Sequence, residues 1–141
     1  MKANEFVKNH GWKLVKDLIE RGKDQTHVSN DSRMMIDAER YIREYPWFAD
    51  DVDEMVSLVD LKRLVESYEL VDELGGFEKA KLHLVATDKR LGYTHVYLHE
   101  NGRYCWLDDY IDHIPFCAIS IDSATKAITD VESVESLKEM T

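Results

Sequence analysis

Cysteine is scarce in this sequence, which has only Cys105 and Cys117 among its 141 residues. Two cysteines are too few for the disulfide framework that stabilises many small secreted domains. A chain of this length can bury a hydrophobic core large enough to be stable without disulfide bonds. Because both cysteines lie in apolar, strand-like surroundings, we expect reduced, buried thiols in a cytoplasmic protein. A bridge between them, or a pair of metal ligands, is the alternative.

Long apolar runs are absent as well. No segment approaches the roughly 18 apolar residues that a membrane-spanning helix requires. Residues 1–15 lack the apolar core of a signal peptide. We therefore expect a cytoplasmic protein that does not act at a membrane.

Positive charge is also in short supply, with 18 Lys and Arg residues against 28 Asp and Glu and a net charge of −10. The deficit is concentrated in residues 44–73, where ten acidic residues accompany two basic ones, a net charge of −8. Nucleic-acid binding draws much of its affinity from neutralising phosphates, so direct nucleic-acid binding is not expected. An acidic surface can instead attract a basic protein partner, although acidity can also serve solubility alone.

Chemical signatures are missing too: the sequence has no nucleophile elbow, phosphate-binding loop, HExxH motif or paired CxxC. The most tempting metal ligands are His95 and His99, yet on a strand their Cα atoms would be roughly 13 Å apart. We expect no catalytic residue, no cofactor and no metal, even when Cys105, His113 and Cys117 are added to the candidates. One alternative is a small hydrolase with an Asp/His site in residues 108–113, formed by Asp108, Asp109, Asp112 and His113.

The most distinctive stretch is Gly92–Leu107, in which two runs rich in β-branched and aromatic residues flank Asn101-Gly102. This dipeptide favours a two-residue type I′ turn and therefore predicts a β-hairpin at residues 92–107. Such a turn fixes the register. It would place Val96, Leu98, Cys105 and Leu107 on a core face, and Tyr97 opposite Trp106, His99 opposite Tyr104 and His95 opposite Asp108 on the other face.

Apolar residues at helical spacing predict helices elsewhere, and an extended pattern predicts a third strand at residues 116–122. Whether residues 50–74 form one helix or two, broken near Asp60, stays open. Three aromatic residues flank the helix stop at Pro46, and we expect them to form a hydrophobic corner, with an exposed interaction knob as the alternative. The helices are expected at residues 5–10, 12–21, 31–45, 50–74, 77–85 and 123–139, and the three aromatic residues are Tyr45, Trp47 and Phe48.

These elements predict an α+β fold: a single domain of residues 1–141 with four to six helices around a small three-stranded antiparallel sheet. The chain would be helical over residues 1–85, form the hairpin and third strand over 92–122, and end in a helix over 123–139. Residues 87–92 would be the loop into the hairpin. A second alternative function is a helix-turn-helix transcription regulator that uses residues 69–84, with Lys79 and Lys81 near the DNA. The ten preceding acidic residues would oppose it.

Three blocks, MKANEFVKNHGW, DLKRLVESYELVDELGGFEKAK and AITDVESV, resemble uncharacterised small early-region accessory proteins of lambdoid phages and prophages. The blocks cover about a third of the chain and leave out residues 86–122. The resemblance implies a cytoplasmic protein of an infected bacterium, of a kind that often binds host proteins. It supplies no catalytic residues.

Our leading hypothesis is a non-enzymatic accessory protein that binds a host or phage protein through an acidic and aromatic surface. Such a surface could inhibit a basic partner by mimicking nucleic acid. A homodimer is a further expectation if the aromatic hairpin face is exposed. The residues we expect to bind the partner are Tyr97, Trp106, Tyr104, His99, Asp50, Asp51, Asp53 and Glu54.

Overall fold

The computed structural model describes residues 1–85 and 92–139. It divides into two compact units: unit 1 holds residues 1–65 and 133–141, and unit 2 holds residues 66–132. Each unit combines helices with one three-stranded antiparallel sheet, which confirms the predicted α+β class. Residues 87–91 of the predicted loop lie outside the described residues.

Unit 1 contains a small sheet that the sequence analysis did not predict. Its strand order is β2-β1-β3, with β1 at His27–Val28, β2 at Met35–Ile36 and β3 at Val56–Ser57. The strands have only two residues each, too short for an alternating pattern to stand out in the sequence. Val28 and Val56 are opposite each other and buried, so this sheet contributes directly to the core.

The sheet corrects one helix prediction and answers a question that the sequence left open. Residues 31–37 were expected to begin a helix, but they form the loop after β1 and then β2. The helix starts only at Ala38, where the Asp37 side chain accepts a hydrogen bond from the Glu39 N–H at 3.2 Å. Strand β3 likewise divides residues 50–74 into two helices, so the break lies before Asp60.

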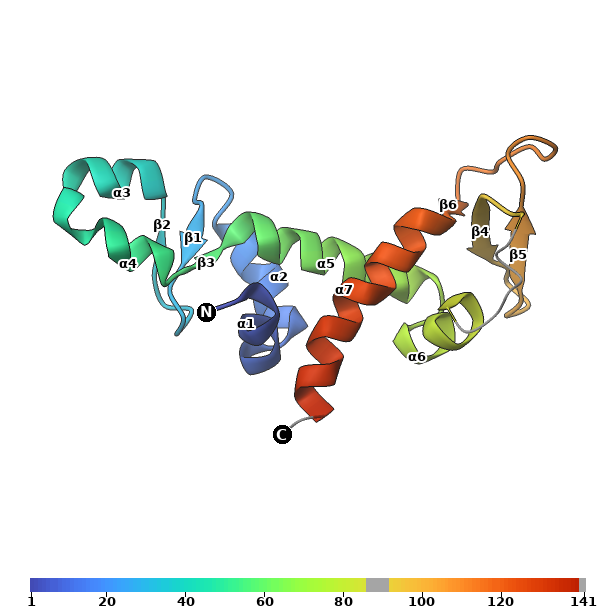
Figure 1. Ribbon diagram of the computed structural model, residues 1–141, viewed down its shortest axis with the longest axis horizontal. Helices are drawn as coiled ribbons and strands as arrows, with labels where there is room; N and C mark the ends of the chain where they lie inside the picture. Colours follow the sequence, from blue (N-terminus) through green and yellow to red (C-terminus); the bar gives the residue numbers. More distant parts are fainter. Residues whose placement is uncertain (86–91, 140–141) are drawn as a thin grey trace. The chain divides into compact units, whose positions relative to one another are not determined.

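The core of unit 1 forms where helices α1 (Ala3–His10) and α2 (Trp12–Arg21) meet the sheet and the first part of α5 (Leu58–Glu73). Figure 1 shows α1 and α2 in blue beside the start of α5. Val134, from the last helix α7 (Ile121–Glu139), completes the cluster. The other buried members are Phe6, Val7, Val15, Leu18, Val28, Val56, Leu58, Leu61, Leu64 and Val65.

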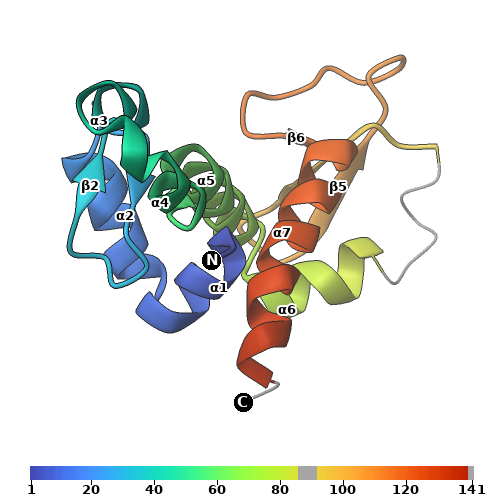
Figure 2. The same ribbon diagram turned by 60° about the vertical axis from the view of Figure 1, so that its left-hand side comes forward.

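Beyond β2, unit 1 continues into helix α3 (Ala38–Glu44), the single 3₁₀ turn η1 (Pro46–Phe48) and helix α4 (Ala49–Asp53). We call residues 38–54 the aromatic–acidic arm. Figures 1 and 2 show α3 and α4 folded against each other next to β2. All residues of the aromatic–acidic arm are described, and Val52 is the only one that is buried.

Unit 2 contains the predicted hairpin, formed by β4 (His95–Leu98) and β5 (Tyr104–Leu107), but its register differs by one residue from the prediction. Tyr97 is opposite Cys105, and Val96 is opposite Trp106. The loop has three residues instead of two: Gly102 N–H donates to the His99 carbonyl, and only Gly102, at φ 84°, has positive φ. That geometry is a type I turn with a bulge, whereas type I′ would need positive φ at Asn101 too.

Because side chains alternate along a strand, the shift changes which residues share a face. Tyr104 and Trp106 lie on the same face as the buried Val96, and Tyr97 and Cys105 lie on the other. The predicted aromatic face is therefore wrong, as is the predicted pairing of His95 with Asp108. His95 is opposite Leu107.

The third strand is confirmed but shorter than predicted. Strand β6 spans Ile119–Ser120, where it pairs with β4, and α7 already begins at Ile121. The segment predicted as a helix over 77–85 consists of α6 (Phe77–Ala80) and a π-helical turn, η2 (Lys81–Val85). Both cysteines are free, but Cys117 is exposed and Cys105 only half-buried, so the prediction of two buried thiols is wrong.

Candidate functional site

Four aromatic rings gather on the aromatic–acidic arm. The Tyr45 ring is 5.4 Å from that of Tyr41 and 6.5 Å from those of Trp47 and Phe48, while the Trp47 and Phe48 rings are 6.1 Å apart. These separations are typical of favourable aromatic pairs. Three of the rings are nevertheless exposed: Tyr45 and Phe48 are each 44% exposed and Trp47 is 72% exposed. The three residues around Pro46 thus form an exposed cluster, which is the alternative to the expected hydrophobic corner.

The four predicted acidic residues of this region follow the cluster directly. Asp50, Asp51 and Asp53 belong to α4 and Glu54 follows it, and all four are exposed. No ion pair is formed by any of these carboxylates within the part of the chain that the structure describes. The acidic residues predicted to bind a partner therefore follow an aromatic cluster within one segment, the aromatic–acidic arm. The hairpin aromatics are not part of this segment.

The cations of the aromatic–acidic arm are already paired inside α3. Arg40 lies 3.1 Å from Glu44, and Arg43 lies 3.2 Å from Glu39. Both pairs span four residues of the helix and are exposed, so each adds little to stability. They leave α3 electrically balanced and the negative charge concentrated on α4 and Glu54.

The hairpin residues predicted to bind a partner do not share one surface. Tyr104 and Trp106 lie on one face of the hairpin and Tyr97 on the other, and these three side chains are half-buried. Interaction with the Cys105 thiol on the opposite strand raises the pKa of the Tyr97 hydroxyl. His99 is exposed near the turn, where its Nδ1 accepts a hydrogen bond from the Asn101 N–H at 3.2 Å.

Tyr104 is committed to packing inside unit 2. Its hydroxyl donates a hydrogen bond to the Leu74 carbonyl at the end of α5, and its ring lies 5.6 Å from that of His83. Lys79 Nζ is 5.5 Å from the centre of the same ring. Burial raises the pKa of the Tyr104 hydroxyl. These contacts make Tyr104 an anchor of the hairpin rather than a free contact for a partner.

We expect Tyr104→Phe to lower the free energy of unfolding by about 1 kcal/mol, because it removes a hydrogen bond and leaves the Leu74 carbonyl without that donor. Urea denaturation of the two proteins measures the difference. Tyr110→Phe is the matched control, since the Tyr110 side chain is 93% exposed. Equal losses in both variants would contradict the anchoring role.

The lysines proposed for DNA contact in the helix-turn-helix alternative both have partners within unit 2. Lys79 Nζ donates to the Gly102 carbonyl at 2.7 Å, and Lys81 Nζ lies 2.6 Å from a Glu132 carboxylate oxygen. The second helical piece of the motif is irregular, because α6 (Phe77–Ala80) passes directly into the π-helical turn η2. The geometry therefore adds nothing in favour of DNA recognition by residues 69–84.

The acidic loop of the hydrolase alternative uses its carboxylates to hold its own turn. Asp108 Oδ1 accepts the Tyr110 N–H at 3.0 Å, and Asp112 Oδ2 accepts the Asp108 N–H at 2.9 Å. His113 is exposed. Among residues 1–85 and 92–139, no group of three or more His, Cys, Asp or Glu side chains is arranged to hold a metal ion.

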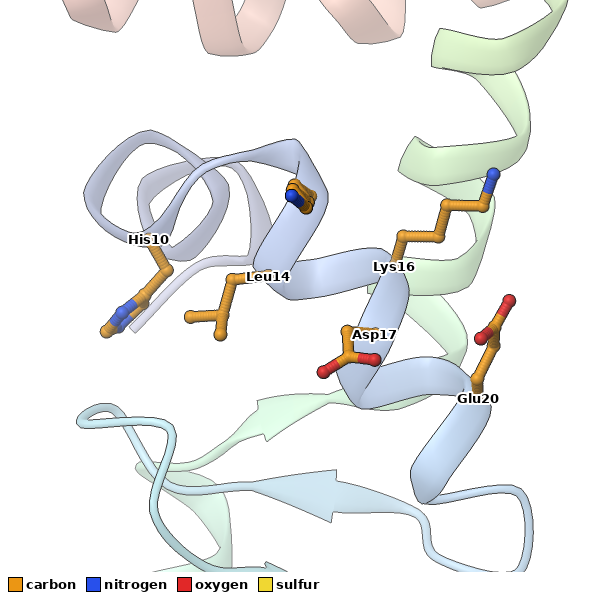
Figure 3. A pocket seen from close by; sticks show the side chains of 6 residues that line it. His10, Leu14, Lys16, Asp17 and Glu20 are labelled. Atoms are coloured by element: carbon orange, nitrogen blue, oxygen red, sulfur yellow. The ribbon is translucent and has the colours of Figure 1, made fainter.

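A surface depression on α1 and α2 is not a better candidate for a functional site. Figure 3 shows its side chains spread along the helices instead of converging on one point. The His10 ring is already 2.8 Å from the Asn30 carbonyl, and Asp17 pairs with Arg21 at 3.4 Å. The lining residues are His10, Lys13, Leu14, Lys16, Asp17 and Glu20.

Comparisons with protein-family models, curated proteins and solved structures find no match to this chain. None of its described helices is both long and apolar enough to cross a membrane. The aromatic–acidic arm is thus identified as the candidate site by its own chemistry. Its acidic residues are predicted from the sequence as a partner surface, whereas its aromatic residues are predicted to pack in a corner, because ring exposure is not visible in a sequence.

Proposed function

We propose that this chain is a non-enzymatic accessory protein that binds a host or phage protein through the aromatic–acidic arm. The observation that carries the proposal is the combination of exposed aromatic rings with four carboxylates that have no described ion-pair partner. Exposed aromatic clusters are unusual on a monomer surface, and tryptophan and tyrosine dominate the binding energy of many interfaces. The resemblance to phage accessory proteins is the reason to look for the partner in a bacterial cytoplasm.

A basic partner surface fits this arrangement best. The carboxylates of α4 and Glu54 would steer a positively charged surface toward the aromatic–acidic arm, and the rings would bury apolar area once it arrives. A protein that normally binds nucleic acid offers such a surface. In that case the row of carboxylates would take the place of phosphates, and the chain would act as an inhibitor.

Partner capture tests this proposal. Tagged full-length protein is used to purify bound proteins from bacterial cells, side by side with Trp47→Ala and with the triple variant D50N/D51N/D53N. We expect a partner that the unmodified protein retains and that both variants lose, because truncating a central interface aromatic typically costs 2 kcal/mol or more, roughly thirtyfold in affinity. Raising the salt concentration should weaken the complex.

The controls carry single changes of the same kinds, at exposed positions outside the aromatic–acidic arm. They are Tyr110→Ala and Asp24→Asn, neither of which should affect capture. Circular dichroism confirms that each variant is folded. Partners retained equally by Trp47→Ala and by the unmodified protein would contradict the proposal.

A further inference from the structure

The aromatic–acidic arm has an excess of negative charge that its own residues do not neutralise. Arg40 and Arg43 pair with glutamates of α3, at 3.1 and 3.2 Å. Asp50, Asp51 and Asp53 have no cation beside them among the described ion pairs. A nucleic acid or an anionic lipid surface would be repelled. The occupant that complements this site is therefore a cation carried by a protein segment.

The exposed rings favour one kind of cation. Trp47 is 72% exposed, and its ring plane stands at 83° to that of Tyr45, so the two rings are not stacked on each other and most of the Trp47 surface is accessible. A planar guanidinium stacks on an aromatic face and still presents N–H donors at its rim. A lysine ammonium is a compact, strongly hydrated charge that gains less from such a ring.

The chain spacing brings ring and carboxylate within reach of one side chain. Turn η1 ends at Phe48, which is the N-cap of α4, and Asp50 and Asp51 in the first turn of α4 follow Trp47 by three and four residues. Even a fully extended chain could place their Cα atoms no more than roughly 10–14 Å from that of Trp47. A guanidinium on the Trp47 ring can therefore donate hydrogen bonds to an adjacent carboxylate, and charge-assisted bonds of this type are the strong ones.

From this geometry, and resting on the proposed function, we infer that the aromatic–acidic arm recognises arginine side chains of a basic partner segment. An arginine stacks on Trp47 and bonds to Asp50 or Asp51. Lysine can pair with the carboxylate but gains less from contact with the Trp47 ring. The site thus distinguishes between two cationic residues that bulk electrostatics treats alike.

Two short synthetic peptides test the inference with the full-length protein. They have the same length and charge and differ only in carrying arginine or lysine at every cationic position. Calorimetric titration at low salt is expected to show the arginine peptide binding roughly two- to fivefold more tightly, the range that a cation–π contact at an exposed site supplies. Trp47→Ala should remove this preference. D50N/D51N should lower the affinity for both peptides, and the control Tyr110→Ala should change neither affinity.

Equal affinity for the two peptides, no binding of either, or a preference that survives Trp47→Ala would overturn the inference. These outcomes are distinguishable from failure of the proposed function. A partner captured through the aromatic–acidic arm, with no arginine preference in the peptides, would leave the protein-binding function standing and remove only the arginine specificity.

Discussion

Replacing Phe6 by alanine is expected to lower the free energy of unfolding by about 3–5 kcal/mol, the range seen for truncating a buried aromatic residue. Phe6 is 0% exposed and belongs to the hydrophobic cluster of unit 1. Its removal deletes apolar contacts and leaves a cavity that the surrounding helices and strands fill only in part. A loss of this size is a large fraction of the stability of an ordinary domain. Urea denaturation monitored by circular dichroism measures it.

Phe116→Ala is the matched control, because the same atoms are removed from a fully exposed position, 108% exposed. We expect a change within about 0.5 kcal/mol there. A loss for Phe6→Ala no larger than that of the control would show that α1 does not pack on the core as described. The assignment of the unit 1 core would then be wrong.

The second large effect is expected for Gly75→Ala, which should cost about 2–4 kcal/mol through strain combined with crowding. Gly75 has φ 98°, a conformation that residues with a Cβ rarely adopt. An added Cβ would lie 3.1 Å from Lys79 Cδ and 3.2 Å from Leu98 Cδ2. Both distances are shorter than an ordinary van der Waals contact, so the Lys79 and Leu98 side chains would have to shift by a few tenths of an ångström.

Gly76→Ala separates the two contributions. Gly76 has φ 96°, but an added Cβ would have nothing within 4 Å. We expect only the backbone strain, about 1–3 kcal/mol, and so a smaller loss than at Gly75. Thermal or urea unfolding of the two variants gives the comparison. If Gly76→Ala costs as much as Gly75→Ala, the close approach of Leu98 to Gly75 contributes nothing.

The functional proposals rest on acidic and aromatic residues of the aromatic–acidic arm, and the sequence predicts the exposure of the acidic ones only. The acidic run of residues 50–54 is visible as composition, and it lies on the surface because isolated carboxylates are costly to bury. Tyr45, Trp47 and Phe48 are equally visible as residues, but their exposure is a property of the folded chain. Aromatic residues at a helix stop usually pack back onto that helix, and here they pack mainly on one another.

The sequence by itself determined the α+β class, the helical structure of α5 and α7, the hairpin and the position of the negative charge. These features follow from local rules: apolar spacing, turn residues and the charge of each side chain. Only the tertiary structure decided the hairpin register, because a bulge at Gly102 adds one loop residue and exchanges the faces of the strands. It also decided the two-residue strands of unit 1 and the exposed rings of the aromatic–acidic arm, since pairing and burial depend on residues far away in the chain.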